Sequence, residues 1–359
     1  MFKRAGVIAL VLILALSLVV VGCGKKEDVK KEETKQEVKE PAKDLTINGA
    51  GATFPYPLYS KMFSAYNKLN PEIKVNYQSI GSGGGVKQMM EGTVSFGASD
   101  AFLSEEEMGK IKNGVIHVPM TIGAVAVVYN LEGIASGVKL TQETLTDIYL
   151  GTIKKWNDPK IAADNSDIKL PNVDITPVFR SDGSGTTSIF TDYLSKVSSE
   201  WKEKVGAGKS VKFPAGIGGK GNEGVAGQVK QLPGSIGYVE LAYATTNNLS
   251  YAKLRNKDGN FTAPSLEAAS AAAAGAIADM PKDTRVSIVE PGGKDAYGIV
   301  GFSWILLNEK YEDQVMKEEL LKLTKWMYRD GQQFSKALHY APIPEEIAKL
   351  NDNNLAVIK

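Results

Sequence analysis

The sequence predicts an α/β fold, because segments with strand character alternate with helical patterns from Asp44 to the end of the chain. More than 300 residues lie in this part, which is enough for two domains with cores of their own. The predicted strands are Lys74–Gln78, Val94–Ala98, Ala124–Tyr129, Ile175–Phe179, Ile236–Val239, Val286–Val289 and Gly301–Leu307.

Three of the helical patterns have recognisable ends or faces. Ser104 and Glu107 have the spacing of a capping box. Thr141 is expected to begin a helix that Gly151 ends. Another helix is expected over residues 57–69, where apolar residues recur at helical spacing and predict a face buried in the core. Its members are Leu58, Met62, Tyr66 and Leu69.

Residues 1–22 have the pattern of an export signal. Lys3 and Arg4 precede an almost wholly apolar run, and small residues stand before Cys23. The Val-Val-Gly-Cys stretch resembles a bacterial lipobox, which implies a diacylglyceryl group on Cys23 and a lipid anchor in the cell membrane. An uncleaved transmembrane anchor is the alternative, since the apolar run is roughly long enough to span a bilayer. Both interpretations place the remaining chain outside the cytoplasm.

Residues 23–43 are predicted to form a disordered, charged tether, because they contain too little apolar surface to offset the entropy of ordering. The whole chain has 42 basic and 41 acidic residues, so its charge gives no indication of binding to nucleic acid or anionic lipid. Cys23 is the only cysteine, which excludes an internal disulfide and a cysteine-rich metal cluster.

Three short stretches rich in glycine, serine and threonine each precede a helix-like pattern. They are residues 50–55 (Ala-Gly-Ala-Thr-Phe-Pro), 81–85 (Gly-Ser-Gly-Gly-Gly) and 180–187 (Arg-Ser-Asp-Gly-Ser-Gly-Thr-Thr). The first turn of a helix has N–H groups without intrahelical partners and the positive end of the helix dipole. Three such loops, with Arg180 at the start of the third, predict a site for one small oxyanion.

These loops resemble the ligand loops of the phosphate-binding proteins of bacterial phosphate ABC transporters. The resemblance rests on residues 50–55, 81–88 (Gly-Ser-Gly-Gly-Gly-Val-Lys-Gln), 96–100 (Phe-Gly-Ala-Ser-Asp) and 180–186, in that order. It extends to residues 147–156, 216–224 and 232–242, and covers roughly residues 45–345.

The resemblance implies a two-lobed periplasmic-binding-protein-like fold with hinge strands and a ligand cleft between the lobes. Lobe 1 would comprise residues 44–128 and 299–359, and lobe 2 residues 129–298. Backbone N–H and hydroxyl groups would donate to phosphate, Arg180 would supply the full positive charge, and Asp182 would orient Arg180. The phosphate-binding residues that the resemblance implies are Thr53, Phe54, Ser82, Asp100, Arg180, Ser184, Gly185 and Thr186.

Asp100 stands where the family has an acceptor for the phosphate proton. A carboxylate repels an anion unless that anion has a proton to donate, which monohydrogen phosphate has and sulfate at neutral pH lacks. A buried polar group left unpaired by the wrong ligand discriminates by about 10⁴- to 10⁵-fold. The sequence departs from the family at Gly83, where a second serine is frequent, and at Gly298, where proline is frequent.

Three features of the sequence bear on functions other than phosphate binding. Gly216, Gly218 and Gly221 match a dinucleotide fingerprint, with Glu240 about twenty residues further on. A serine hydrolase would use Ser184, but the chain offers only two histidines as a base and no G-x-S-x-G turn at this serine. A binding protein for sulfate or molybdate is a further alternative.

The sequence therefore predicts an extracytoplasmic, lipid-anchored solute-binding protein that is not an enzyme. It would bind inorganic phosphate as a monomer, with no cofactor, no metal and no nucleic acid. The resemblance implies that it delivers phosphate to the permease subunits of an ABC transporter and their ATPase.

Overall fold

The computed structural model of the chain describes residues 44–277 and 280–359. The predicted signal peptide, the tether and Cys23 lie outside these residues. The compact unit Lys43–Lys359 contains the hydrophobic core, which extends from Ile47 to Ile358. Within the described ranges, no helix has both the length and the apolar character needed to cross a membrane.

The described residues form the following strands and helices. The strands are β1 (Leu45–Gly51), β2 (Ile73–Ser79), β3 (Phe96–Ser99), β4 (Ile116–Tyr129), β5 (Lys139–Leu140), β6 (Thr176–Arg180), β7 (Ile217–Gly219), β8 (Ser235–Glu240), β9 (Ser250–Tyr251), β10 (Lys253–Arg255), β11 (Phe261–Thr262) and β12 (Val300–Leu307). The α-helices are α1 (Tyr56–Leu69), α2 (Ser82–Glu91), α3 (Glu105–Gly109), α4 (Gln142–Leu150), α5 (Pro159–Asp164), α6 (Gly185–Val197), α7 (Ser199–Lys204), α8 (Gly221–Gln231), α9 (Leu241–Thr246), α10 (Leu266–Ala276), α11 (Gln314–Tyr328) and α12 (Glu345–Leu355). Two short 3₁₀ turns, Asp330–Phe334 and Lys336–Leu338, separate α11 from α12.

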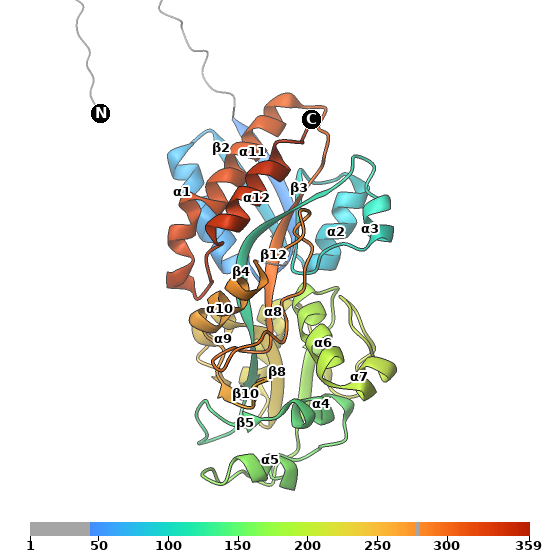
Figure 1. Cartoon of the computed structure of the whole chain (residues 1–359), viewed down its shortest axis with the longest axis vertical. Coiled ribbons are helices and arrows are strands. Elements are labelled where there is room, and N and C mark those ends of the chain that lie inside the picture. The colour runs from blue at the N-terminus through green and yellow to red at the C-terminus, as the bar shows by residue number, and fades with distance from the viewer. Residues whose placement is uncertain (1–43, 278–279) are drawn as a thin grey trace, which may run out of the picture. The chain divides into compact units, whose positions relative to one another are not determined.

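The main sheet has the strand order β2-β1-β3-β12-β4-β8-β6-β7, with β9 against β4. Strand β4 connects the two halves of this sheet, because its residues 116–124 pair with β12 and its residues 125–129 pair with β8. In Figure 1, β4 and β12 run side by side, with α1, α2, α11 and α12 around one end and α4, α6 and α7 around the other. We call β1, β2 and β3 the first half-sheet, and β6, β7 and β8 the second half-sheet.

Strand β4 is buried along almost its whole length, which explains its sequence. Residues His117 to Tyr129 are all buried, so the strand is a nearly continuous apolar run without alternation. In the first half-sheet β1 pairs in parallel with β2 and β3, and helices α1 and α2 connect these strands. In the second half-sheet β6 pairs in parallel with β7 and β8. These parallel strands place the loops that follow β1, β3 and β6 next to helix N-termini.

Most predicted elements are present, and two predictions are wrong. The capping box at Ser104 and the helix between Thr141 and Gly151 are confirmed. Residues 286–289 form no strand, although Ile288 and Val289 are buried as predicted. The Val289 carbonyl accepts a hydrogen bond from Lys196 Nζ instead of from a neighbouring strand. Leu69 is 66% exposed instead of buried, since α1 ends there at the surface.

Candidate functional site

The loops that follow β1 and β3 come together around Ser82, the first residue of α2. Gly51, at the end of β1, has a φ of +148°, and a Cβ there would lie 2.0 Å from the Ala98 carbonyl oxygen, so only glycine fits this close approach. Asp100 follows β3 and donates its backbone N–H to Ser82 Oγ at 3.1 Å. The sequence thus places a hydroxyl and a carboxylate, both fully buried or nearly so, at the same edge of the first half-sheet.

Ser82 also contacts the second half of the molecule. Its Oγ accepts a hydrogen bond from the backbone N–H of Gly185 at 3.0 Å, at the N-terminus of α6. Gly83 N–H donates to the Gly183 carbonyl oxygen at 2.8 Å. Lys209 forms an ion pair of 2.6 Å with Glu107 of α3. The loops that carry the predicted ligands therefore touch each other directly.

Arg180 is buried at the end of β6 and is held by a bidentate pair. Its Nε donates to Asp182 Oδ1 at 2.8 Å and its Nη2 to Asp182 Oδ2 at 2.6 Å. Its Nη1 donates to Thr186 Oγ1 at 3.3 Å. Burial would raise the pKa of the Asp182 carboxyl, but the hydrogen bonds and charge of Arg180 lower that pKa below its usual value. The bidentate pair thus fixes the orientation of the guanidinium, and the low pKa of Asp182 keeps its partner carboxylate charged.

Thr53 and Thr186 share one partner, Asn222, in the first turn of α8. Asn222 Nδ2 donates to Thr53 Oγ1 at 2.8 Å and to Thr186 Oγ1 at 3.1 Å. The Asn222 backbone N–H also donates to Thr53 Oγ1 at 3.1 Å. The carbonyl oxygen of Thr53 accepts from the Tyr243 hydroxyl at 2.5 Å. Thr53 therefore lies within the same cluster as Arg180 and Thr186.

The Asp100 carboxylate has hydrogen-bond donors on both oxygens. Ser303 Oγ, from β12, donates to Asp100 Oδ1 at 2.7 Å, and Ser82 Oγ lies 3.4 Å from Asp100 Oδ2. Burial raises the pKa of Asp100 from 3.8 to about 7, although the hydrogen bonds from Ser303 and Ser82 and the charge of Arg180 oppose this rise. Asp100 is therefore a group that can change its proton occupancy near neutral pH.

The other predicted residues have their own contacts. Ser184 is the N-cap of α6, where its Oγ accepts from the Thr187 N–H at 3.0 Å, and its own N–H donates to the Lys209 carbonyl. Phe54 is fully buried, and its carbonyl accepts from the Tyr340 hydroxyl at 2.7 Å. The structure thus joins Thr53, Arg180 and Thr186 by hydrogen bonds in one group, through Asn222, and Ser82, Asp100 and Gly185 in a second group. The two groups meet at the Gly185–Thr186 peptide and are together called the cluster, with Ser184 and Phe54 adjoining it in the chain.

Gly83 and Gly298 both occupy tight positions. A Cβ at Gly83 would lie 2.9 Å from the Gly183 Cα, so a larger residue would hinder the observed contact between the two loops. A Cβ at Gly298 would lie 2.5 Å from Tyr193 Cε2. The two departures from the family pattern therefore allow close packing in this chain.

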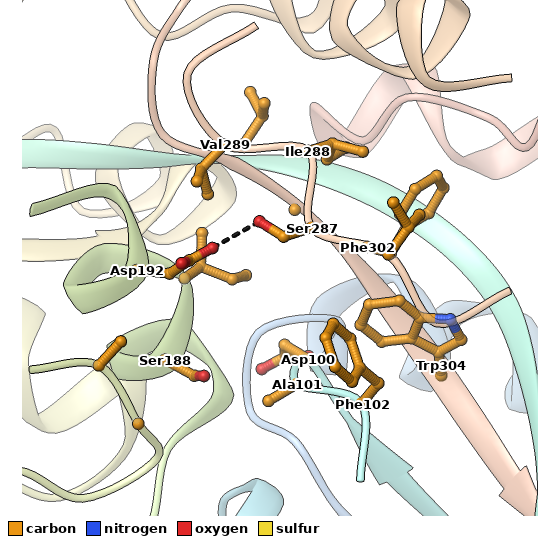
Figure 2. Close-up of a pocket in the computed structure, with 16 residues that line it drawn as sticks. Asp100, Ala101, Phe102, Ser188, Asp192, Ser287, Ile288, Val289, Phe302 and Trp304 are labelled. Carbon is orange, nitrogen blue, oxygen red and sulfur yellow. Dashed lines mark hydrogen bonds between the residues drawn. The ribbon is translucent and has the colours of Figure 1, made fainter. Parts of the chain in front are cut away.

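A cavity of about 220 Å³ lies beside this cluster (Figure 2). Asp100, Phe102 and Trp304 line one side, and Ser188 and Asp192 of α6 line the other. Most of its remaining lining is aliphatic, and Ser287 Oγ donates a hydrogen bond to Asp192. Because the described residues that line this cavity include two carboxylates, Asp100 and Asp192, and no Lys, Arg or His, the cavity is poorly suited to an oxyanion. The hydrogen-bonded cluster is the better candidate for the anion site.

The two competing sequence motifs fulfil other roles. Gly221 N–H donates to Asp182 Oδ1 at 3.0 Å, so the N-terminus of α8 is occupied by the protein's own groups rather than offered to a pyrophosphate. Glu240 is fully buried and accepts from the Ala242 N–H at 2.8 Å, which makes it the N-cap of α9. His117, a potential base for a hydrolase, accepts a hydrogen bond from the Leu103 N–H at its Nε2.

Asn222 and Ser303 are site residues that sequence reasoning missed. Asn222 directly follows the glycines of residues 216–221, and an amide at the end of such a glycine-rich loop is a signal for a ligand-binding or positioning residue. Ser303 is the one hydroxyl within the apolar strand β12, which is a signal for a buried polar partner. Neither residue reveals from sequence which groups it contacts.

Comparison with known proteins identifies the family to which the chain belongs. The model of a family described as "PBP superfamily domain" matches residues 36–330. A phosphate-binding protein PstS from Xylella fastidiosa (strain Temecula1) is 43% identical over 346 residues, which cover 94% of each chain. A PstS from Pasteurella multocida is 47% identical over 303 residues, covering 84% of this chain and 87% of the relative. The chain therefore belongs to the PBP superfamily and, within it, to the family of PstS phosphate-binding proteins.

Solved structures confirm the predicted two-lobed α/β fold. A high-affinity periplasmic phosphate-binding protein, PfluDING, has a TM-score of 0.67 at 21% identity, with 87% of this chain and 93% of that chain covered. An ancestral soluble variant of the human phosphate-binding protein also has a TM-score of 0.67, at 20% identity, with 88% and 98% covered. At these identities the likeness establishes the fold alone.

Proposed function

We propose that this chain is an extracytoplasmic solute-binding lipoprotein that captures inorganic phosphate and delivers it to an ABC-type phosphate importer. The observation that carries the proposal is the buried cluster that contains Arg180, three hydroxyls and the Asp100 carboxylate, contributed by both halves of the molecule. The PstS relatives, which are phosphate-binding proteins by name, support the choice of ligand.

The role of each residue follows from its chemistry. Arg180, oriented by Asp182, supplies the positive charge, and Thr53, Ser82, Ser184 and Thr186 supply hydroxyl donors. The N–H groups of Phe54 and Gly185 and those at the start of α6 complete the donor set. Asp100 accepts the phosphate proton and so selects against sulfate. Phosphate entry would exchange the bonds from Gly185 N–H to Ser82 and from Ser184 N–H to Lys209 for bonds to the anion.

The proposal includes motion of two lobes, residues 44–128 with 299–359 and residues 129–298. The donors come from both lobes, so neither lobe satisfies phosphate alone, and closure about β4 and β12 brings them together. The closed form is then the state that the permease subunits recognise. The protein acts as a monomer that binds without catalysis, and the lipid on Cys23 holds it at the outer face of the cell membrane.

Calorimetric titration of the unit from Lys43 onward with phosphate, arsenate and sulfate tests the ligand. One-to-one binding of phosphate and arsenate with far weaker sulfate binding is expected, because only the first two offer a proton to Asp100. Sulfate affinity within tenfold of phosphate would favour another oxyanion and contradict the proposal. Small-angle scattering with and without phosphate tests closure, and an unchanged radius of gyration at saturation would refute the two-lobe mechanism.

Mass spectrometry of the membrane-extracted full chain tests the anchor. An acylated N-terminal Cys23 is expected, and Cys23→Ala should abolish lipid attachment. A processed chain that begins at Cys23 without acyl groups would contradict the lipoprotein assignment.

A further inference from the structure

The hydroxyls of Thr53 and Thr186 each accept as many hydrogen bonds as a hydroxyl can. A threonine hydroxyl has one proton to donate and two lone pairs to accept with. Thr53 Oγ1 accepts from the backbone N–H and the Nδ2 of Asn222. Thr186 Oγ1 accepts from Asn222 Nδ2 and from Arg180 Nη1. Both hydroxyls therefore have only their protons left to offer to a ligand.

The orientation of the Asn222 amide is fixed by a further contact. Its Oδ1 accepts a hydrogen bond from the Glu240 backbone N–H at 2.9 Å, and the side chain is fully buried. Because that N–H can only donate, Oδ1 must face Glu240, and Nδ2 must face the two threonines. Rotation of the amide would leave the buried Glu240 N–H opposite another donor, which is costly.

We propose that Asn222 is a positioning residue for anion capture, whose buried amide makes the hydroxyls of Thr53 and Thr186 obligate hydrogen-bond donors. This inference rests on the proposed function and deepens it. A ligand must present an unprotonated oxygen to each threonine, so its proton is left for Asp100. Asn222 also joins the segment after β1 to the N-terminus of α6, and so couples donor orientation to the contact between the two halves of the molecule.

Phosphate calorimetry on substituted proteins tests this role. Asn222→Ala should weaken phosphate binding about 10- to 100-fold, since both hydroxyls regain the freedom to point their protons elsewhere. Asn222→Asp should weaken it more, because a carboxylate accepts the threonine protons while it still accepts the Glu240 N–H. Asn165 is a matched control, since it is also buried and bonds Lys139 and Ile161 away from the site. Asn165→Ala should lower the melting temperature and leave phosphate affinity within twofold.

A double-mutant cycle distinguishes positioning from a general structural role. In a Thr53→Val background, the fold-loss caused by Asn222→Ala should fall severalfold, because one of the two hydroxyls that it positions is gone. Equal fold-losses in both backgrounds would overturn the inference. If Asn222→Ala does not fold, the same cycle is measured with Asn222→Asp, which keeps the shape and the Glu240 contact.

Different results overturn the proposed function and the positioning role of Asn222. A parent protein that does not bind phosphate overturns the proposed function and this inference with it. A parent that binds phosphate while Asn222→Ala and Asn222→Asp stay within threefold of it overturns the inference alone.

Discussion

Removal of the Arg180 charge is the perturbation whose cost follows most directly from the structure. The guanidinium has five N–H donors, of which Nε, one on Nη2 and one on Nη1 are engaged by Asp182 and Thr186. One N–H on each Nη atom is left for an anion. The Arg180 side chain is only 1% exposed, so little solvent screens its charge. Arg180→Met keeps most of the side-chain volume and removes both the donors and the charge.

The loss has two parts. Phosphate loses its cationic partner, and Asp182 remains as an uncompensated carboxylate with 13% side-chain exposure. Truncation of one partner of a buried charge pair costs about 2 to 5 kcal/mol, which corresponds to roughly 30- to 5,000-fold in dissociation constant. Because part of this cost comes from Asp182, Arg180→Met combined with Asp182→Asn should bind phosphate more tightly than Arg180→Met alone.

Isothermal titration calorimetry of the unit from Lys43 onward, after removal of contaminating phosphate, measures these affinities. Arg285→Met is the control, since Arg285 also forms ion pairs, with Glu105 and Asp283, but lies outside the cluster. The control should bind like the parent. An Arg180→Met protein within threefold of the parent, or one that Asp182→Asn weakens further, would refute the charge-pair reasoning.

Three other predictions concern selectivity, pH and closure. Asp100→Asn should narrow the affinity gap between phosphate and sulfate, because the amide can donate a hydrogen bond to sulfate. Competition calorimetry measures the ratio of the two affinities. An unchanged ratio would show that Asp100 does not determine the selectivity for phosphate. Burial raises the pKa of Asp100 from 3.8 to about 7, so in phosphate-free solution protonation stabilises the described arrangement, in which this carboxyl is buried, relative to an open one that exposes it. This stabilisation is full below about pH 4 and is lost as the pH rises through about 7. Small-angle scattering at pH 5 and pH 8 should therefore show a more compact protein at pH 5, and Asp100→Asn should remove the difference; a parent with no such difference contradicts the burial of Asp100 in the closed form. Gly83→Ala should weaken phosphate binding about tenfold, because its Cβ would obstruct the approach to Gly183. Gly227→Ala is a suitable control because its added Cβ meets no neighbouring atom, whereas Gly92 has a positive φ that would strain an alanine. Equal phosphate affinity of Gly83→Ala and the parent would show that this contact does not limit closure.

Local patterns in the sequence were sufficient to predict the fold class and the loops of the candidate site. Alternation of strand and helix patterns predicts α/β structure. The capping box at Ser104 and the glycine at position 151 mark helix ends, because these signals depend on residues three or four positions apart. The loops around Thr53, Ser82 and Arg180 precede helix N-termini, which is where an anion site forms for reasons of backbone geometry. Even so, residues 286–289 have the composition of a strand and form none, since apolar burial and strand pairing have separate causes.

Only the tertiary structure decided which distant residues contact the site and how they orient and protonate its groups. Asn222 meets Thr53, 169 positions away in the chain, and Ser303 meets Asp100 across 203 positions, so no local pattern predicts either contact. The raised pKa of Asp100 depends on burial under β12 and on the distance to Arg180, which the sequence does not contain. The reason for a glycine at position 83 is likewise a tertiary contact, because Gly183 packs too closely against it to leave room for a Cβ. The amino-acid sequence determined which groups an anion would meet, because loop chemistry is local; the fold determined their orientation and protonation, because these arise from contacts between distant segments.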